Sequence, residues 1–116
     1  MPLIKIETSV ACDKQQTIEL AKQLSSIVAE CMGKPETYVA TVVETDALVT
    51  FGGEVVPGAF VDVRGIGGFN KDVNTQLTIA ICSCLNKLLD ISSSHVYINF
   101  TDIAAVNWGC DNKTFG

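Results

Sequence analysis

Residues 3–35 read LIKIETSVACDKQQTIELAKQLSSIVAECMGKP, and this stretch decides the fold. Its first six residues alternate, with Ile4 and Ile6 on one side and charged residues between them. Side chains two apart share one face of a β-strand. The pattern therefore predicts a strand over Leu3–Thr8 with one buried face.

An amphipathic helix is predicted after this strand. Asp13 can cap its first turn, and Gln16, three residues later, completes a capping box. Gly33 provides a C-terminal stop, and Pro35 prevents the helix from continuing. Apolar residues between these signals recur at the spacing of one helix face. They are Ile18, Leu20, Ala21, Leu24, Ile27, Val28 and Cys31.

The same order of elements occurs a second time. A strand is predicted over Tyr38–Val43, a glycine-rich loop over Phe51–Gly58 and a third strand over Ala59–Ile66. A second helix follows over Lys71–Leu89, and a fourth strand over Val96–Phe100. The apolar stripe of the second helix comprises Val73, Leu77, Ala80, Ile81, Cys84, Leu85 and Leu88. The short tail is predicted to supply edge-strand residues at Trp108, Thr114 and Phe115.

Strand–helix–strand repeated twice predicts an α/β (α+β) fold in a single domain of residues 1–116. A helix of this size suits a parallel crossover, so two β-α-β repeats form a four-stranded mixed sheet with both helices on one face. The opposite face is expected to be too apolar for water and to pack against neighbouring subunits.

Composition excludes several classes of function. Eight Lys and Arg against thirteen Asp and Glu give a net charge of −5, without a basic run, so a nucleic-acid partner is not expected. The most apolar window, Leu77–Leu89, is interrupted by polar residues, so no membrane span is expected. The first residues carry charges where a secretory leader would be apolar, so no leader is expected and they are interpreted as mature protein. The expected location is cytoplasmic.

The cysteines and the single histidine do not form a recognisable metal or disulfide pattern. Five cysteines are an odd number, and no C-x-x-C occurs. Free, mostly buried thiols in a reducing compartment are expected. With His95 as the only histidine, no metal site is predicted.

Several short motifs, in order and along nearly the whole chain, resemble the macrophage migration inhibitory factor (MIF) family of the tautomerase superfamily. They are Met1-Pro2, Gly33-Lys34-Pro35 with Tyr38, Phe51-Gly52-Gly53, Gly65-Ile66-Gly67-Gly68, Val96-Tyr97-Ile98-Asn99-Phe100, Asn107-Trp108-Gly109 and Thr114-Phe115. The resemblance implies a homotrimer with a keto–enol tautomerase site at each subunit interface.

The resemblance also implies roles for individual residues. Pro2 matches the family's catalytic base, exposed by removal of the initiator methionine, and Lys34 the lysine that meets the substrate carboxylate. Ile66 is similar to a position whose backbone N–H contacts the ligand. Tyr97 and Asn99 match a pair donated by the adjacent subunit. Taken alone, Pro2 fits the start of a strand better than a base, and Lys34 fits a surface lysine at a helix end better than a ligand contact. Ile66 also fits an ordinary strand end, and an exposed strand face explains Tyr97 and Asn99 equally well.

Tyr38, Trp108 and Phe115 resemble residues of the pocket wall. Core packing explains Tyr38 and Phe115 equally well. The sequence departs from the family pattern at Cys110, where many members carry a second tryptophan, and at Gly65, where a serine is frequent. The family's C-x-x-C is absent, so thiol-oxidoreductase activity is unsupported.

The chemistry of Pro2 can also be argued without the family. An α-amino group titrates near pKa ~8, and an apolar pocket with a nearby cation lowers that value. A base poised near neutral pH suits proton abstraction beside a carbonyl. Together with the resemblance, which implies the reaction and its substrates, this predicts tautomerisation of a 2-oxo acid or its enol, of the phenylpyruvate or dopachrome type, without cofactor or metal.

Two other functions remain open at this point. Family members act as cytokines without a signal peptide, so the chain also fits a secreted signalling ligand with a cell-surface receptor, exported by a leaderless route. A third reading is a non-catalytic small-molecule-binding module, for which retention of Met1 would change nothing.

Overall fold

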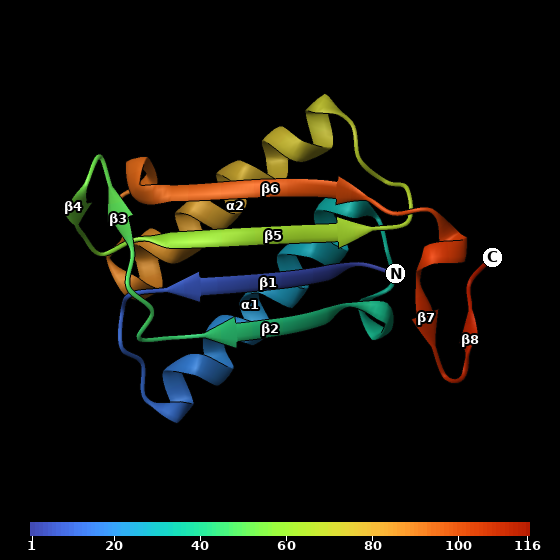
Figure 1. The fold of residues 1–116 in the computed structure, drawn as a ribbon, viewed down its shortest axis with the longest axis horizontal. Helices are drawn as coiled ribbons and strands as arrows, with labels where there is room; N and C mark the ends of the chain where they lie inside the picture. Colours follow the sequence, from blue (N-terminus) through green and yellow to red (C-terminus); the bar gives the residue numbers. More distant parts are fainter.

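The computed structural model describes residues 1–116 and contains one four-stranded mixed sheet (Figure 1). The strand order is β2-β1-β5-β6. β1 pairs in parallel with β2, and β5 in parallel with β6, while β1 and β5 are antiparallel. The four strands are β1 (Leu3–Thr8), β2 (Ala40–Glu44), β5 (Ala59–Gly65) and β6 (Val96–Asp102).

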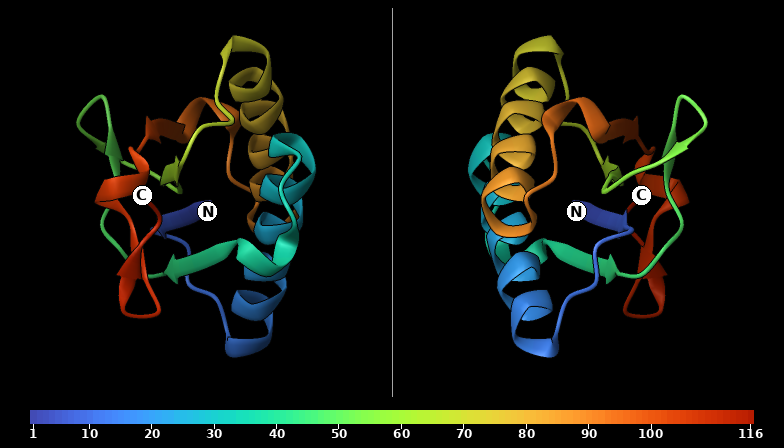
Figure 2. Two further views of the ribbon diagram at one scale, coloured as in Figure 1. Left: turned by 90° about the vertical axis from the view of Figure 1, so that its right-hand side faces the viewer. Right: turned by 90° about the vertical axis from the view of Figure 1, so that its left-hand side faces the viewer.

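Each parallel pair is joined by a helix, as two β-α-β repeats require. Helix α1 (Lys14–Met32) connects β1 to β2, and α2 (Lys71–Leu89) leads from β5 to β6. Both helices cover one face of the sheet (Figure 2). The predicted fold class is therefore confirmed. Neither helix is long and apolar enough to cross a membrane.

The predicted helix signals operate as expected. The Gln16 N–H donates to Asp13 Oδ1 at 2.8 Å, and the Asp13 N–H donates to Gln16 Oε1 at 2.9 Å, which completes the capping box. Gly33 adopts φ 63°, a left-handed conformation that glycine tolerates without a Cβ clash, and so ends α1. Asn70 caps α2 through the N–H of Val73.

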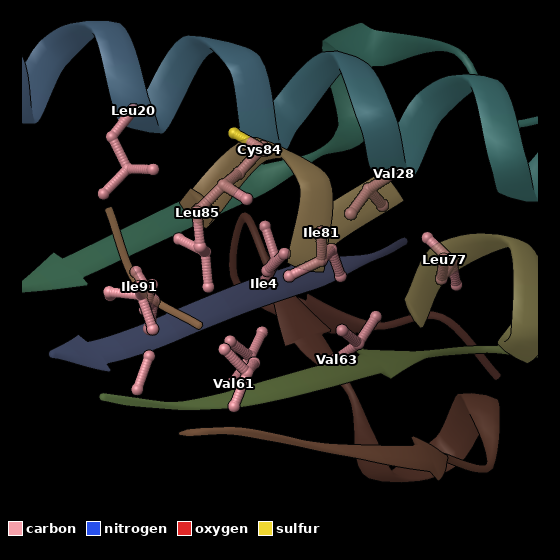
Figure 3. Close-up of a cluster of buried hydrophobic side chains, with 14 of the residues drawn as sticks. Ile4, Leu20, Val28, Val61, Val63, Leu77, Ile81, Cys84, Leu85 and Ile91 are labelled. Atoms are coloured by element: carbon pink, nitrogen blue, oxygen red, sulfur yellow. The ribbon is translucent and has the colours of Figure 1, made fainter. Parts of the chain in front are cut away.

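A continuous apolar core lies between the helices and the sheet (Figure 3). Ile4 and Ile6 of β1 and Val61 and Val63 of β5 are fully buried, as period-two alternation predicts. The helices contribute mainly Leu20, Leu24, Val28, Leu77, Ile81 and Leu85. In the first stripe, Ile18 was predicted wrongly, because this residue is exposed.

The second strand begins later than predicted. Tyr38 lies in the short helix η1 (Glu36–Tyr38), and β2 starts at Ala40. The Tyr38 N–H donates to the carbonyl of Pro35 at 3.1 Å, so a turn outcompetes the strand preference of Tyr38. The third strand likewise ends at Gly65, one residue before Ile66.

The predicted loop over residues 51–58 and the tail each contain a small hairpin. β3 (Thr50–Phe51) pairs with β4 (Glu54–Val55) across Gly52-Gly53, both with positive φ. β7 (Gly109–Cys110) pairs with β8 (Lys113–Thr114). Of the predicted edge-strand residues, only Thr114 lies in a strand. The two hairpins lie at opposite ends of the sheet, on the side away from the helices (Figures 1 and 2).

The sheet face opposite the helices is more polar than predicted. Phe60, Tyr97 and Val42 are exposed there, but so are ion pairs that join Lys5 Nζ to Glu44 Oε1 at 3.4 Å and Arg64 Nη2 to Asp62 Oδ2 at 2.8 Å. Alternation predicted which residues face outward, but the apolar character assigned to them was wrong.

The thiols are also less buried than predicted. All five cysteines are free, but only Cys84 is buried, and Cys110 is exposed. Burial raises the pKa of the Cys84 thiol and keeps it protonated. No group of three or more His, Cys, Asp or Glu side chains is arranged to hold a metal ion.

Two isoleucines of α2 test the packing. Ile81 is fully buried, whereas Ile79 on the same helix is 59% exposed. We expect Ile81→Ala to lower the free energy of unfolding by about 2–5 kcal/mol, because the buried side chain leaves a cavity. Ile79→Ala should change it by about 0.5 kcal/mol or less. Urea unfolding at one fixed protein concentration measures both, and equal losses would contradict the assigned core.

Candidate active site

Six of the predicted site residues come together at one end of the sheet. This end holds the start of β1, the end of α1 with η1, the turn after β5 and the C-terminal segment, and both chain termini lie there (Figure 1). The residues that these segments bring to this end are Pro2, Lys34, Tyr38, Ile66, Trp108 and Phe115.

Pro2 is buried at the start of β1. Its carbonyl accepts a hydrogen bond from the Ala40 N–H at 3.0 Å, which extends the β1–β2 pairing by one residue. Directly before it, the amine of Met1 has a pKa lowered below its usual value, first by burial and then by the charge of Lys34. A terminal amine at this position is therefore partly desolvated and close to a cation.

Lys34 is positioned by the end of α1 and by the turn after β5. Its N–H donates to the carbonyl of Ala29 at 3.0 Å, within the left-handed cap at Gly33. Its side chain lies along Gly68, where a Cβ would be 3.2 Å from Lys34 Cε and 3.8 Å from Nζ. Gly68 also has φ +88°, so both its conformation and the space left for Lys34 favour glycine.

The turn that carries Ile66 is fastened to the end of β6. The Gly67 N–H donates to Asp102 Oδ1 at 2.8 Å, and the Ile103 N–H donates to the Gly65 carbonyl at 2.7 Å. Sequence reasoning missed Asp102. The strand register is what identifies Asp102. In the parallel pairing of β5 with β6, Asp102 is opposite Gly65, so β6 ends beside the turn.

The space around Gly65 is narrow on one side. A Cβ there would lie 3.3 Å from Met32 Cε and 3.4 Å from the ring of Phe69. The contact with Phe69 is an ordinary van der Waals distance, whereas the end of the flexible Met32 side chain would have to shift by a few tenths of an ångström to accept a Cβ. Glycine at this position fits beside Met32 without such a shift.

Trp108 lines a groove on the sheet face away from the helices. The groove has a volume of about 320 Å³. The Phe115 N–H donates to the Trp108 carbonyl at 3.0 Å and closes the base of the C-terminal hairpin. Cys110, in contrast, lies exposed on β7. The residues of the groove are Leu3, Arg64, Ile103, Asn107, Trp108 and Gly109.

Tyr38 and Phe115 differ in their surroundings. Tyr38 is 55% exposed, so core packing does not explain it. Phe115 is half-buried at the base of the tail, and this burial fits both a packing role and a place in the pocket wall.

Tyr97 and Asn99 lie apart from the other six residues. Both side chains are exposed on β6, on the face away from the helices. In the strand register, Tyr97 is opposite Phe60, which is opposite Glu7. At about 3.3 Å per residue, this level is roughly 17 Å along the strands from Pro2. The ring of Tyr97 packs edge-on against Phe51, with centroids 5.0 Å apart.

This arrangement defines a small α+β protein of two β-α-β repeats, with a buried proline and a lysine at one end of a shared sheet. The sequence model of one family, described as Macrophage migration inhibitory factor (MIF), matches residues 1–116. The chain belongs to the MIF family.

Individual relatives agree with this assignment. The chain is 33% identical over 115 residues to macrophage migration inhibitory factor of Xenopus laevis, covering 99% of each chain. The crystal structure of a MIF-like protein from Entamoeba histolytica matches with a TM-score of 0.94 and 34% identity, over 98% of each chain. A MIF homologue from Prochlorococcus marinus matches with a TM-score of 0.93 and 34% identity, over 98% of this chain and 99% of the other.

The Asp102 contact can be tested separately from any reaction. We expect Asp102→Ala to lower stability by about 1 kcal/mol, the usual net contribution of one hydrogen bond, and to accelerate hydrogen exchange at the Gly67 amide. Asp102→Asn retains an acceptor oxygen and should exchange nearly as slowly as the wild type. Amide exchange followed by NMR measures this, and equal protection of Gly67 in all three proteins would show that the contact does not order the turn.

Proposed function

We propose that the protein is a keto–enol tautomerase for 2-oxo acids of the phenylpyruvate or dopachrome type. Pro2, freed by removal of Met1, is its general base. Family membership supports a tautomerase in general terms. The observation that carries the specific proposal is the convergence of buried Pro2 with Lys34 and Ile66 at one end of the sheet.

The environment of Pro2 suits a base that works near neutral pH. After processing, the secondary amine of Pro2 is the chain terminus. An ordinary α-amino group has a pKa near ~8. Burial and the charge of Lys34, which lower the pKa of the Met1 amine, act one residue further along on Pro2 in the same direction. A larger neutral fraction is then available at neutral pH to accept a proton.

The remaining groups of this end orient the substrate. Lys34 binds the carboxylate of the 2-oxo acid as a point charge. The backbone N–H of Ile66 donates to the ligand from the turn fastened by Asp102. Neutral Pro2 takes a proton from the carbon next to the keto group, which leaves an enolate, and protonated Pro2 returns that proton to the enolate oxygen to give the enol. Trp108, Phe115 and Tyr38 form the walls around the aromatic end.

Tyr97 and Asn99 act in this proposal from an adjacent subunit of a homotrimer. Three observations support it: both side chains are exposed, Tyr97 lies roughly 17 Å along the strands from Pro2 of its own chain, and β2 and β6 are unpaired sheet edges. The Tyr hydroxyl and the Asn amide donate hydrogen bonds to the developing enolate oxygen, the kind of stabilisation that contributes most to such steps.

A secreted signalling ligand is the second proposal, and the names of the relatives favour it. In this case the partner is a cell-surface receptor and the tautomerase reaction is incidental. We propose a cytoplasmic location for the enzyme and a leaderless route for the ligand. The Pro2→Ala variant distinguishes the two proposals. A signalling ligand acts through its outer surface and would keep its biological activity in this variant, whereas an enzyme would lose its activity.

Removal of the proline ring tests the base directly. We expect Pro2→Ala to reduce phenylpyruvate tautomerisation by about 100-fold or more, the range of one general base. The assay follows enol–keto interconversion by ultraviolet absorbance with protein of verified N-terminal mass. A chain that retains Met1 should be inactive, because the Pro2 nitrogen is then an amide. Unchanged turnover in either protein, with unchanged circular dichroism, would exclude Pro2 as the base.

The acid limb of the pH profile tests the neighbouring cation. The neutral amine is the active form, so kcat/KM rises with pH through the pKa of Pro2 and the limb should lie below pH ~8. Lys34→Gln removes one cause of the lowered pKa, and we expect the limb to move to higher pH. The limb should still lie below the ordinary pKa of an α-amino group, because burial, the larger cause of the lowered pKa, remains. A limb that does not move would show that Lys34 does not act on this amine.

A further inference from the structure

The groove that begins at Leu3, next to Pro2, contains a cation, Arg64. The reaction proposed above does not use this cation. Arg64 lines this groove together with Leu3 and Trp108. In the antiparallel register Arg64 pairs with Leu3, the residue directly after Pro2. Paired residues share a sheet face, so Arg64 lies on the face away from the helices.

The guanidinium of Arg64 is held in place with donors to spare. Its Nε donates to Asp62 Oδ2 at 2.9 Å, and its Nη2 lies 2.8 Å from the same oxygen. The Asp62 side chain is 15% exposed and the Arg64 side chain 51%. A guanidinium carries five N–H donors, so Asp62 orients one edge and leaves the other donors free.

Lys34 and Arg64 reach this end of the sheet from opposite sides. Lys34 follows α1, on the helix side, and lies along Gly68, whereas Arg64 is on the other face. Arg64 lines the groove together with Leu3, the residue that follows Pro2, and the charge of Lys34 reaches the terminal amine that precedes Pro2. A substrate that contacts both cations would therefore span the start of β1 and carry an anionic group at each end.

We propose that Arg64 forms a subsite for the distal carboxylate of a 2-oxo acid that carries two carboxylates. The planar guanidinium fork matches a carboxylate better than an ammonium does. Leu3, Ile103 and Trp108 provide an apolar wall for the methylene groups between the two anionic ends. This inference rests on the proposed function, because it assigns a substrate class to the same site.

The test compares 2-oxoglutarate with its 5-methyl ester, which differs by the distal charge. Exchange of the C3 protons in D2O, followed by ¹H NMR, gives kcat/KM for each compound. We expect the wild type to prefer the diacid by roughly 10- to 100-fold, the range of a charge-assisted hydrogen-bonded contact. In Arg64→Gln this preference should fall toward one, through KM. Lys14→Gln removes a distant cation at the start of α1 and should keep the preference.

A binding readout separates this inference from the proposed function. Trp108 is the only tryptophan and lies in the groove, so its fluorescence reports binding without turnover. We expect tighter binding of the diacid than of the ester in the wild type and equal binding in Arg64→Gln. The double variant Asp62→Asn/Arg64→Gln should behave in the same way and avoids an unpaired carboxylate if the single variant folds poorly.

The outcomes are distinct. No preference for the diacid in the wild type, or an equal loss for diacid and ester in Arg64→Gln, would overturn the subsite even if phenylpyruvate is tautomerised. Absence of turnover with all three 2-oxo acids would overturn the proposed function. Charge-dependent binding at Trp108 would then still support the anion subsite.

Discussion

The antiparallel pairing of β1 with β5 is the constraint on which the rest of the structure depends. Each β-α-β repeat alone has only two strands beneath one helix, so it would bury a smaller apolar face than the joined four-stranded sheet does. The central pairing joins the repeats and aligns Ile4 and Ile6 with Val63 and Val61 under both helices. Burial of this shared face and the position of the site are therefore consequences of the same register.

The direction of the strands explains why the site residues meet. Because β1 and β5 run in opposite directions, the start of β1 lies beside the end of β5, and Pro2 comes next to the turn of Ile66. The parallel crossover brings the end of α1, with Lys34, to the same end. The parallel pairing of β5 with β6 then places Asp102 where it can fasten the turn.

Local signals predicted the helices and the central strands, since caps, stop residues and periodicity act within one element. The start of β2 was predicted less well, because the turn at Pro35 competes with the strand preference of Tyr38. Roles for Pro2, Lys34 and Ile66 came from the resemblance to a family, not from their pattern. Asp102 and Arg64 were missed because their significance depends on pairing between strands far apart in sequence.

The departures from the family pattern at Gly65 and Cys110 lie outside the residues that line the groove, and Pro2 and Lys34 keep to the pattern. Met32 and Phe69 lie beside Gly65, and the turn that follows Gly65 is hydrogen-bonded to Asp102. Trp108 lines the groove itself, whereas Cys110, where many members carry a second tryptophan, is exposed on β7. The aromatic wall and the guanidinium of Arg64 thus lie on the same side of Pro2. The residues that line a pocket decide which substrate fits, because discrimination between substrates depends on contacts made away from the reacting atoms as well as at them.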